Sequence, residues 1–83
     1  MTVTAQNILD LWATTGGINP VLADDGDGTL TIVERVAARQ AHWPILAYRI
    51  DLWERFGWPV HEMTMPEAQG VADQINGDLQ RKA

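Results

Sequence analysis

The chain has 83 residues, of which 46% are hydrophobic and 20% charged, with no cysteine and a formal net charge of −5. A chain of this length forms one small domain, residues 1–83, and without cysteine it holds no disulfide, no thiolate metal site and no cysteine nucleophile. The acidic balance argues against a nucleic-acid ligand, and no apolar run approaches the ~18 residues of a membrane span, so we expect a soluble, cytoplasmic domain that binds neither nucleic acid nor membrane.

The first part of the chain predicts a helix followed by an acidic turn. Apolar residues recur at helical spacing over residues 4–15, where Thr4 is a suitable N-cap and Gly16 ends the pattern. Residues 18–30 have no helical period, and short apolar arms flank their Asp-Gly pairs. Such arms are typical of a β-hairpin or a structured loop.

A second helix is predicted from the end of this turn. Thr31 and Glu34 have the spacing of a capping box, in which each side chain bonds a free backbone N–H of the other residue. Apolar residues then repeat at intervals of three and four. We therefore expect a helix over residues 32–42.

A third helix is predicted over residues 44–56. Pro44 suits the first helical position, because no hydrogen bond of the helix is lost there, and Gly57 suits a left-handed cap. Apolar residues also alternate between Leu46 and Leu52, so a strand within 43–56 competes with the helix. The terminal signals and the length of the segment favour the helix.

The last predicted helix covers residues 65–80. Thr64 and Glu67 form a second capping box, and an apolar stripe follows at helical spacing. Together, the predicted elements indicate a mainly α domain, a bundle of about four helices with a short hairpin or acidic loop between the first two. The alternative is an α+β fold with a central hairpin.

Residues 23–34 resemble the twelve-residue calcium loop of the EF-hand family. Gly28 stands where that family turns sharply, and oxygen-bearing residues occupy five of its ligand positions: Asp25, Asp27, Thr29, Thr31 and Glu34. The resemblance implies weak Ca²⁺ binding through these five residues. Ala23 occupies the first ligand position, and the loss of that carboxylate favours the other interpretation, a solvated acidic turn.

Aromatic residues concentrate in the centre of the chain, where five of the six lie within the sixteen residues 43–58. Large rings bury much area, so most of them belong to the core. Four tryptophans are many for this length, and we expect at least one ring among Trp53, Trp58 and Tyr48 to anchor a partner protein. Arg49 interrupts the apolar face, and its head either reaches solvent or stacks on a ring.

The acidic residues suggest another kind of binding. Residues 1–34 hold five acidic residues and no Lys or Arg. Carboxylates can act as phosphate surrogates for an inhibitor that occupies the basic, nucleic-acid-binding groove of a host defence protein. The four residues of this hypothesis are Asp24, Asp25, Asp27 and Glu34.

Residues 45–76 resemble small tailed-phage proteins, notably tail assembly chaperones and accessory tail proteins. The resembling features are a helix that ends in Phe-Gly-Trp (56–58) and a Met-Thr-Met-Pro-Glu run (63–67) that opens the last helix. The resemblance implies a non-enzymatic protein of a phage or prophage, in the host cytosol or on the virion, that acts by binding other phage proteins. No motif around His42 or His61 indicates catalysis.

Overall fold

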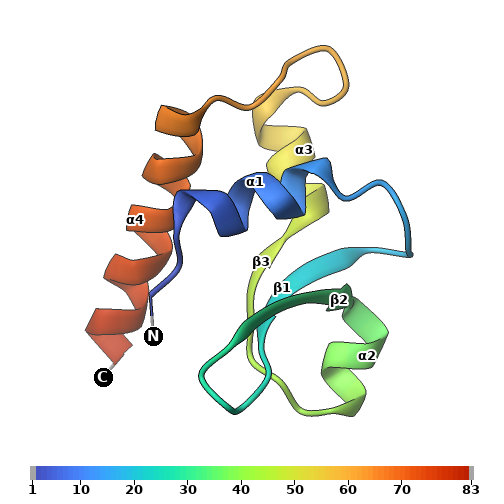
Figure 1. The fold of residues 1–83 in the computed structure, drawn as a ribbon, viewed down its shortest axis with the longest axis vertical. Coiled ribbons are helices and arrows are strands. Elements are labelled where there is room, and N and C mark those ends of the chain that lie inside the picture. Colours follow the sequence, from blue (N-terminus) through green and yellow to red (C-terminus); the bar gives the residue numbers. More distant parts are fainter. Residues whose placement is uncertain (1, 83) are drawn as a thin grey trace.

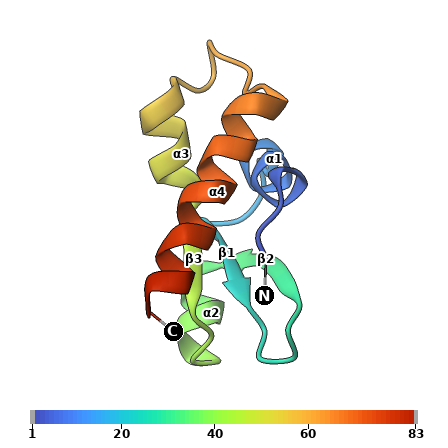
Figure 2. The ribbon, with the colours of Figure 1, turned by 90° about the vertical axis from the view of Figure 1, so that its left-hand side faces the viewer.

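The computed structural model describes residues 2–82, and in them four helices surround a three-stranded antiparallel sheet (Figure 1). The elements in chain order are α1 (Ala5–Ala13), β1 (Pro20–Asp24), β2 (Leu30–Glu34), α2 (Arg35–Gln40), β3 (Ile45–Tyr48), α3 (Arg49–Phe56) and α4 (Met65–Lys82). The strand order is β2-β1-β3 (Figure 2). Within the described residues, none of the helices has the length and apolar character to cross a membrane.

The prediction of a mainly α bundle is wrong, because the centre of the chain forms a sheet and the fold is α+β. The first and last helices lie where the sequence predicts them. Thr4 caps α1 by accepting from the Asn7 N–H. Thr64 and Glu67 form the second predicted capping box, in which the Thr64 N–H donates to Glu67 Oε1 at 3.0 Å.

The helix predicted over residues 32–42 is shorter in the structure, where it begins at Arg35 and ends at Gln40. Residues 30–34 form β2, and α2 begins at Arg35 with no side-chain cap from Glu34. Strand β2 pairs with β1 in an unbroken register, in which Ile32 lies opposite Leu22. Since this pairing satisfies backbone groups on both strands and covers a buried leucine, it outweighs the local capping-box pattern.

The predicted helix over residues 44–56 is also wrong in its first turn. Residues 45–48 form β3, where Ala47 lies opposite Leu22, and only residues 49–56 are helical. The C-terminal end is as predicted: Gly57 adopts φ 81° and its N–H donates to the Trp53 carbonyl. This left-handed backbone angle is readily adopted only by glycine.

Apolar clusters lie on both faces of the sheet. On one face, Leu22 and Ala47 pack with buried residues of α1, α3 and α4, among them Ile8, Leu11, Leu52 and Val71. On the other face, the buried residues are Val21, Ala23 and Ala38 of α2, with Tyr48 and Trp43 partly buried beside them. The larger cluster joins α1 to the sheet and to α4. Figure 1 shows α1 between α4 and α3, above the sheet.

Candidate protein-binding site

An aromatic stack, defined here as Arg49, Trp53 and Trp58, runs along α3 from its first residue to just beyond its last. The Trp53 and Trp58 rings are parallel within 6°, with centroids 3.8 Å apart. Arg49 belongs to the same stack, since its Cζ lies 4.0 Å from the Trp53 ring centroid. The central ring is therefore Trp53, and Arg49 is accounted for by the stacking interpretation of the sequence.

Hydrogen bonds fix the stack to the end of α1. Trp53 Nε1 donates to the carbonyl of Trp12 at 3.1 Å, and Arg49 Nη1 donates to the carbonyl of Thr14 at 2.6 Å. Trp53 also packs against the larger apolar cluster. Of the two tryptophans in the stack, Trp58 is the outer one, 38% exposed and available to a partner.

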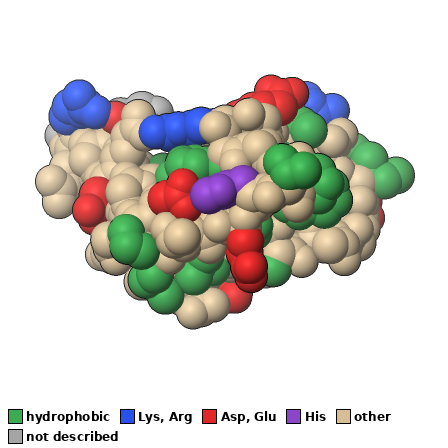
Figure 3. All heavy atoms as spheres, turned by 90° about the horizontal axis from the view of Figure 1, so that it is seen from above, with side chains coloured by type: hydrophobic (Ala, Val, Ile, Leu, Met, Phe, Trp, Pro, Cys, Tyr) green, Lys and Arg blue, Asp and Glu red, His purple; other side chains and the backbone are tan. Residues whose placement is uncertain are grey.

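A groove runs beside the stack, between α1 and the segment of residues 57–63, and we call it the α1 groove. It has a volume of about 590 Å³. Its apolar lining comes from both walls: Leu9, Trp12, Ala13, Trp58, Pro59 and Met63. Val60, which follows Pro59 in this segment, is 94% exposed. Figure 3 shows this end of the molecule, where hydrophobic and acidic side chains lie together. An apolar groove next to such a residue is typical of a binding surface.

Acidic groups line the rim of the α1 groove. Asp10 and Glu62 contribute to its lining, and among the described residues no Lys or Arg does so. His61, another lining residue, is bound to Glu67 with Nε2 2.8 Å from Oε1. The backbone N–H of Thr64 donates to the Glu67 carboxylate, as do the His61 ring and the Thr64 hydroxyl, and these bonds lower the pKa of Glu67 from 4.5 to about 2.

The lowered pKa of Glu67 predicts a pH-dependent contribution to stability. A depressed folded-state pKa stabilises the fold fully above the unfolded value of 4.5, and that stability is lost as the pH falls toward 2. We expect the free energy of unfolding of the wild type to fall across this window more steeply than that of Glu67→Gln. Urea denaturation at a series of pH values measures the difference. Glu54→Gln is the control for loss of one carboxylate, and equal pH dependence in the two variants would contradict the role of Glu67.

The acidic residues of the inhibitor hypothesis lie at two ends of β2. Asp24, Asp25 and Asp27 gather at the hairpin between β1 and β2, where Asp24 Oδ1 accepts from the Gly26 N–H at 3.0 Å and Asp25 Oδ1 accepts from the Asp27 N–H at 2.9 Å. Glu34 ends β2, about 13 Å from the start of that strand at ~3.3 Å per residue. The hairpin thus presents three of the four carboxylates as one group.

The five residues that resemble a calcium loop are likewise divided. Asp25, Asp27 and Thr29 belong to the hairpin turn, which Asp25 closes by donating its N–H to the Thr29 carbonyl at 3.0 Å. Thr31 and Glu34 lie along β2. Within residues 2–82, no three His, Asp or Glu side chains are grouped to hold a metal ion. The carboxylates of Asp24 and Asp25 accept from backbone N–H groups of the turn itself.

The structure separates Tyr48 from the other predicted contact residues. It packs with Val21 and Ala23 on the α2 face of the sheet, whereas Trp53 packs with the cluster on the opposite face. Sequence reasoning missed Leu9, Asp10, His61 and Met63, which join Trp58 in the α1 groove. One sequence feature could have drawn attention to this segment: Val60 is apolar but belongs to a stretch with neither helical nor strand periodicity.

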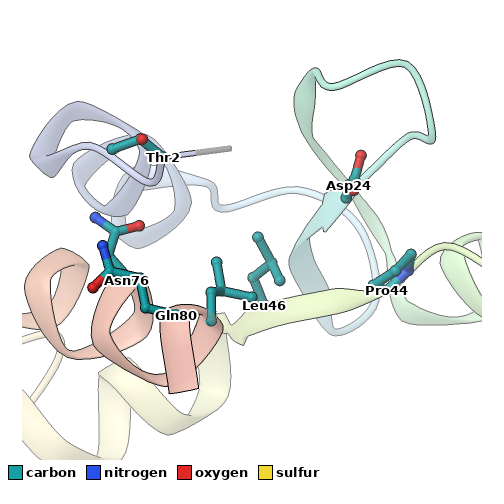
Figure 4. Close-up of a pocket in the computed structure, with 7 residues that line it drawn as sticks. Thr2, Asp24, Pro44, Leu46, Asn76 and Gln80 are labelled. Atoms are coloured by element: carbon teal, nitrogen blue, oxygen red, sulfur yellow. The ribbon is translucent and has the colours of Figure 1, made fainter. Parts of the chain in front are cut away.

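A second cavity, of about 520 Å³, lies between α4 and the sheet (Figure 4). Asp24 and Pro44 are at one end of it, Thr2, Asn76 and Gln80 at the other, and Leu46 lies between. The Asn76 amide is already engaged, because it accepts from the Val3 N–H at 2.8 Å and donates to the Val3 carbonyl at 2.9 Å. Asn76 thus holds the N-terminal segment to α4, and we place the candidate site at the α1 groove.

The chain is a small α+β domain whose α1 groove has apolar residues on both walls and two acidic residues in its lining. Comparisons of the chain with protein-family models, curated proteins and solved structures find no match.

Proposed function

We propose that this chain is a protein-binding module whose contact surface is the α1 groove with the exposed residues Trp58 and Val60. The observation that carries the proposal is a groove with apolar residues on both walls, next to the almost fully exposed Val60, which follows Pro59 of the wall but does not line the groove. Apolar surface left in water costs free energy, and a partner that covers it recovers that energy. Trp58 is held by stacking on Trp53, so little side-chain entropy is lost on binding.

The charge of the groove specifies the chemistry of the partner. Asp10 and Glu62 line the groove beside six apolar residues and the polar Gln6 and His61, and none of the described Lys or Arg residues lines it. A segment that places an aliphatic or aromatic side chain beside a Lys or Arg matches both features, since the apolar group fills the groove and the cation meets the rim. We therefore propose a basic, apolar segment of another protein as the occupant.

The biological setting that we propose is virion or tail assembly in a tailed phage. Its support is the resemblance of residues 45–76 to phage tail assembly chaperones and accessory tail proteins. That stretch includes residues 57–63, which form one wall of the α1 groove. A chaperone or accessory protein of this kind acts by binding other proteins, without catalysis.

Selection from a randomised peptide library tests the proposed occupant. We expect enrichment of peptides with an aliphatic or aromatic residue next to Lys or Arg. Trp58→Ala is expected to raise the Kd of a selected peptide at least about tenfold, because it removes apolar contact in the groove. Val60→Ala is expected to raise it less, because Val60 stands beside the groove and does not line it. Isothermal titration calorimetry measures the change.

Ile18→Ala is the matched control, since Ile18 is also apolar and 72% exposed but lies before β1, away from the groove. Its Kd is expected to equal that of the wild type. Selection of acidic peptides, or equal binding by wild type and Trp58→Ala, would contradict the proposal. Strong loss of affinity with added salt, beyond what a rim of two carboxylates explains, would favour the acidic hairpin as the contact instead.

A further inference from the structure

Strand β2 forms an outer edge of the sheet. It pairs with β1 alone, and Figure 2 shows it on the side of the sheet away from β3. Residues 30–33 are half-buried rather than buried. An edge strand carries a row of unpaired backbone groups that can pair with another strand.

The register with β1 determines which backbone groups face outward. In an antiparallel pair, hydrogen-bonded and non-hydrogen-bonded residue pairs alternate. The Asp25 N–H donates to the Thr29 carbonyl at one end of the register, and the Arg35 N–H donates to the Asn19 carbonyl at the other. Odd-numbered residues of β2 therefore bond β1. Three residues direct their N–H and C=O groups away from it: Leu30, Ile32 and Glu34.

Strand β2 lacks the features that usually protect an edge, which include proline, lysine, bulges and inward-pointing charges. The opposite edge strand, β3, follows Pro44 and has a register shift against β1 between Leu22 and Ala23. By contrast, β2 pairs without a break, and residues 30–33 contain no proline and no charge. Of the two edges, β2 is the one suited to accept another strand.

We propose that a second copy of this chain pairs with β2, antiparallel and about a two-fold axis at Ile32, so that the two sheets become one. In this arrangement Ile32 faces Ile32 of the second copy, and Leu30 faces Glu34 of the second copy. These are the positions with outward backbone groups, so each such pair exchanges two hydrogen bonds.

The side chains of β2 suit this two-fold pairing. Between the hydrogen-bonded pairs, Thr31 lies opposite Val33 of the second copy, at the position where antiparallel strands bring side chains closest. Both residues are β-branched, and cross-strand pairs of this kind stabilise a sheet. Both are half-buried in the single chain, so the second copy would cover surface that is now in water.

Charge complementarity favours a second copy over an unrelated strand. The hairpin that precedes β2 carries Asp25 and Asp27, and α2, which follows β2 directly, carries Arg35 and Arg39. Antiparallel pairing places the acidic hairpin of each copy beside α2 of the other, where the two arginines outnumber Glu34. The same attraction therefore occurs twice about the two-fold axis.

Sedimentation equilibrium of the full chain tests the proposal. We expect a reversible dimer with a Kd below about 1 mM. Asp27→Lys alone and Arg39→Glu alone are each expected to raise this Kd at least about tenfold, because each converts two attractions into repulsions. An equimolar mixture of the two variants is expected to regain wild-type affinity, since both contacts of a mixed dimer are again between opposite charges.

Ile32→Pro provides a second readout, because it removes an outward N–H and leaves the hydrogen bonds to β1 in place. We expect this variant to be monomeric with the far-ultraviolet circular dichroism of the wild type; if it unfolds, the charge variants decide. A wild type that is monomeric at about 1 mM overturns the proposal. So does a folded Ile32→Pro that still dimerises, or a mixture that associates no more tightly than its components.

Discussion

Trp53→Ala is expected to lower the free energy of unfolding by about 3 kcal/mol. This value lies at the lower end of the cost of truncating a large aromatic side chain, because Trp53 is only partly buried. The substitution removes the ring between Arg49 and Trp58 and the hydrogen bond to the Trp12 carbonyl. It also uncovers Arg49, whose Nε is buried without a hydrogen-bond partner. Urea denaturation followed by far-ultraviolet circular dichroism measures the loss without relying on tryptophan fluorescence.

Trp58→Ala is the matched control, since it removes the other tryptophan of the same stack. Trp58 is 38% exposed and stacks from outside, so we expect it to cost less than about 1 kcal/mol. This difference separates a structural ring from one that can meet a partner. Equal losses in the two variants would place both rings in the core and remove the support for Trp58 as a contact residue.

The segment of residues 44–56 shows how far sequence patterns determine this fold. The predicted C-terminal end is confirmed, since Gly57 caps α3. The four residues after Pro44, however, form β3 beside β1 and not the first turn of a helix. The apolar alternation from Leu46 to Leu52 does not describe this four-residue strand, because a register shift places Leu46 and Tyr48 on opposite faces of the sheet and Leu52 lies in α3. A strand this short is decided by its neighbours, because β1 has backbone groups that need a partner on its second side.

The capping-box pattern at Thr31 and Glu34 fails for a related reason, while the same pattern at Thr64 and Glu67 forms. Thr31 lies within β2, opposite Ala23. No strand competes for Thr64, which follows a segment of turns, so the local bonds form there. Local propensity decides the structure where no tertiary partner is available, and long-range pairing decides it elsewhere.

The candidate site was predictable only in part. Trp58 stood out as one of many aromatic residues in a short stretch, and it lines the α1 groove. Leu9 and Asp10 carry no sequence signal that links them to Trp58, because they reach it only through the packing of α1 across the fold. Tyr48 belongs to the same stretch, but it lies on the α2 face of the sheet, since β3 turns its side chain away from α1.

Leu11→Ala is expected to lower the free energy of unfolding by about 3–4 kcal/mol, the largest effect of any substitution considered for this chain. Leu11 is fully buried in α1, within the cluster that joins α1, the sheet and α4. Helix α1 has only nine residues, too few to be stable alone, so packing must hold it in place. Because a small domain has a total stability of about 5–15 kcal/mol, this loss brings the chain near unfolding. Urea denaturation at neutral pH measures it.

Leu9→Ala is the control for this prediction, because it makes the same chemical change in the same helix. The change in intrinsic helix propensity is therefore the same in both variants. Leu9 is only partly buried and lines the α1 groove. We expect it to cost about 1 kcal/mol of stability, since much of its surface is already in water. It should nevertheless weaken peptide binding at the groove, whereas any folded fraction of Leu11→Ala should bind as the wild type does. A loss below about 1 kcal/mol for Leu11→Ala would mean that α1 is not held by its buried face.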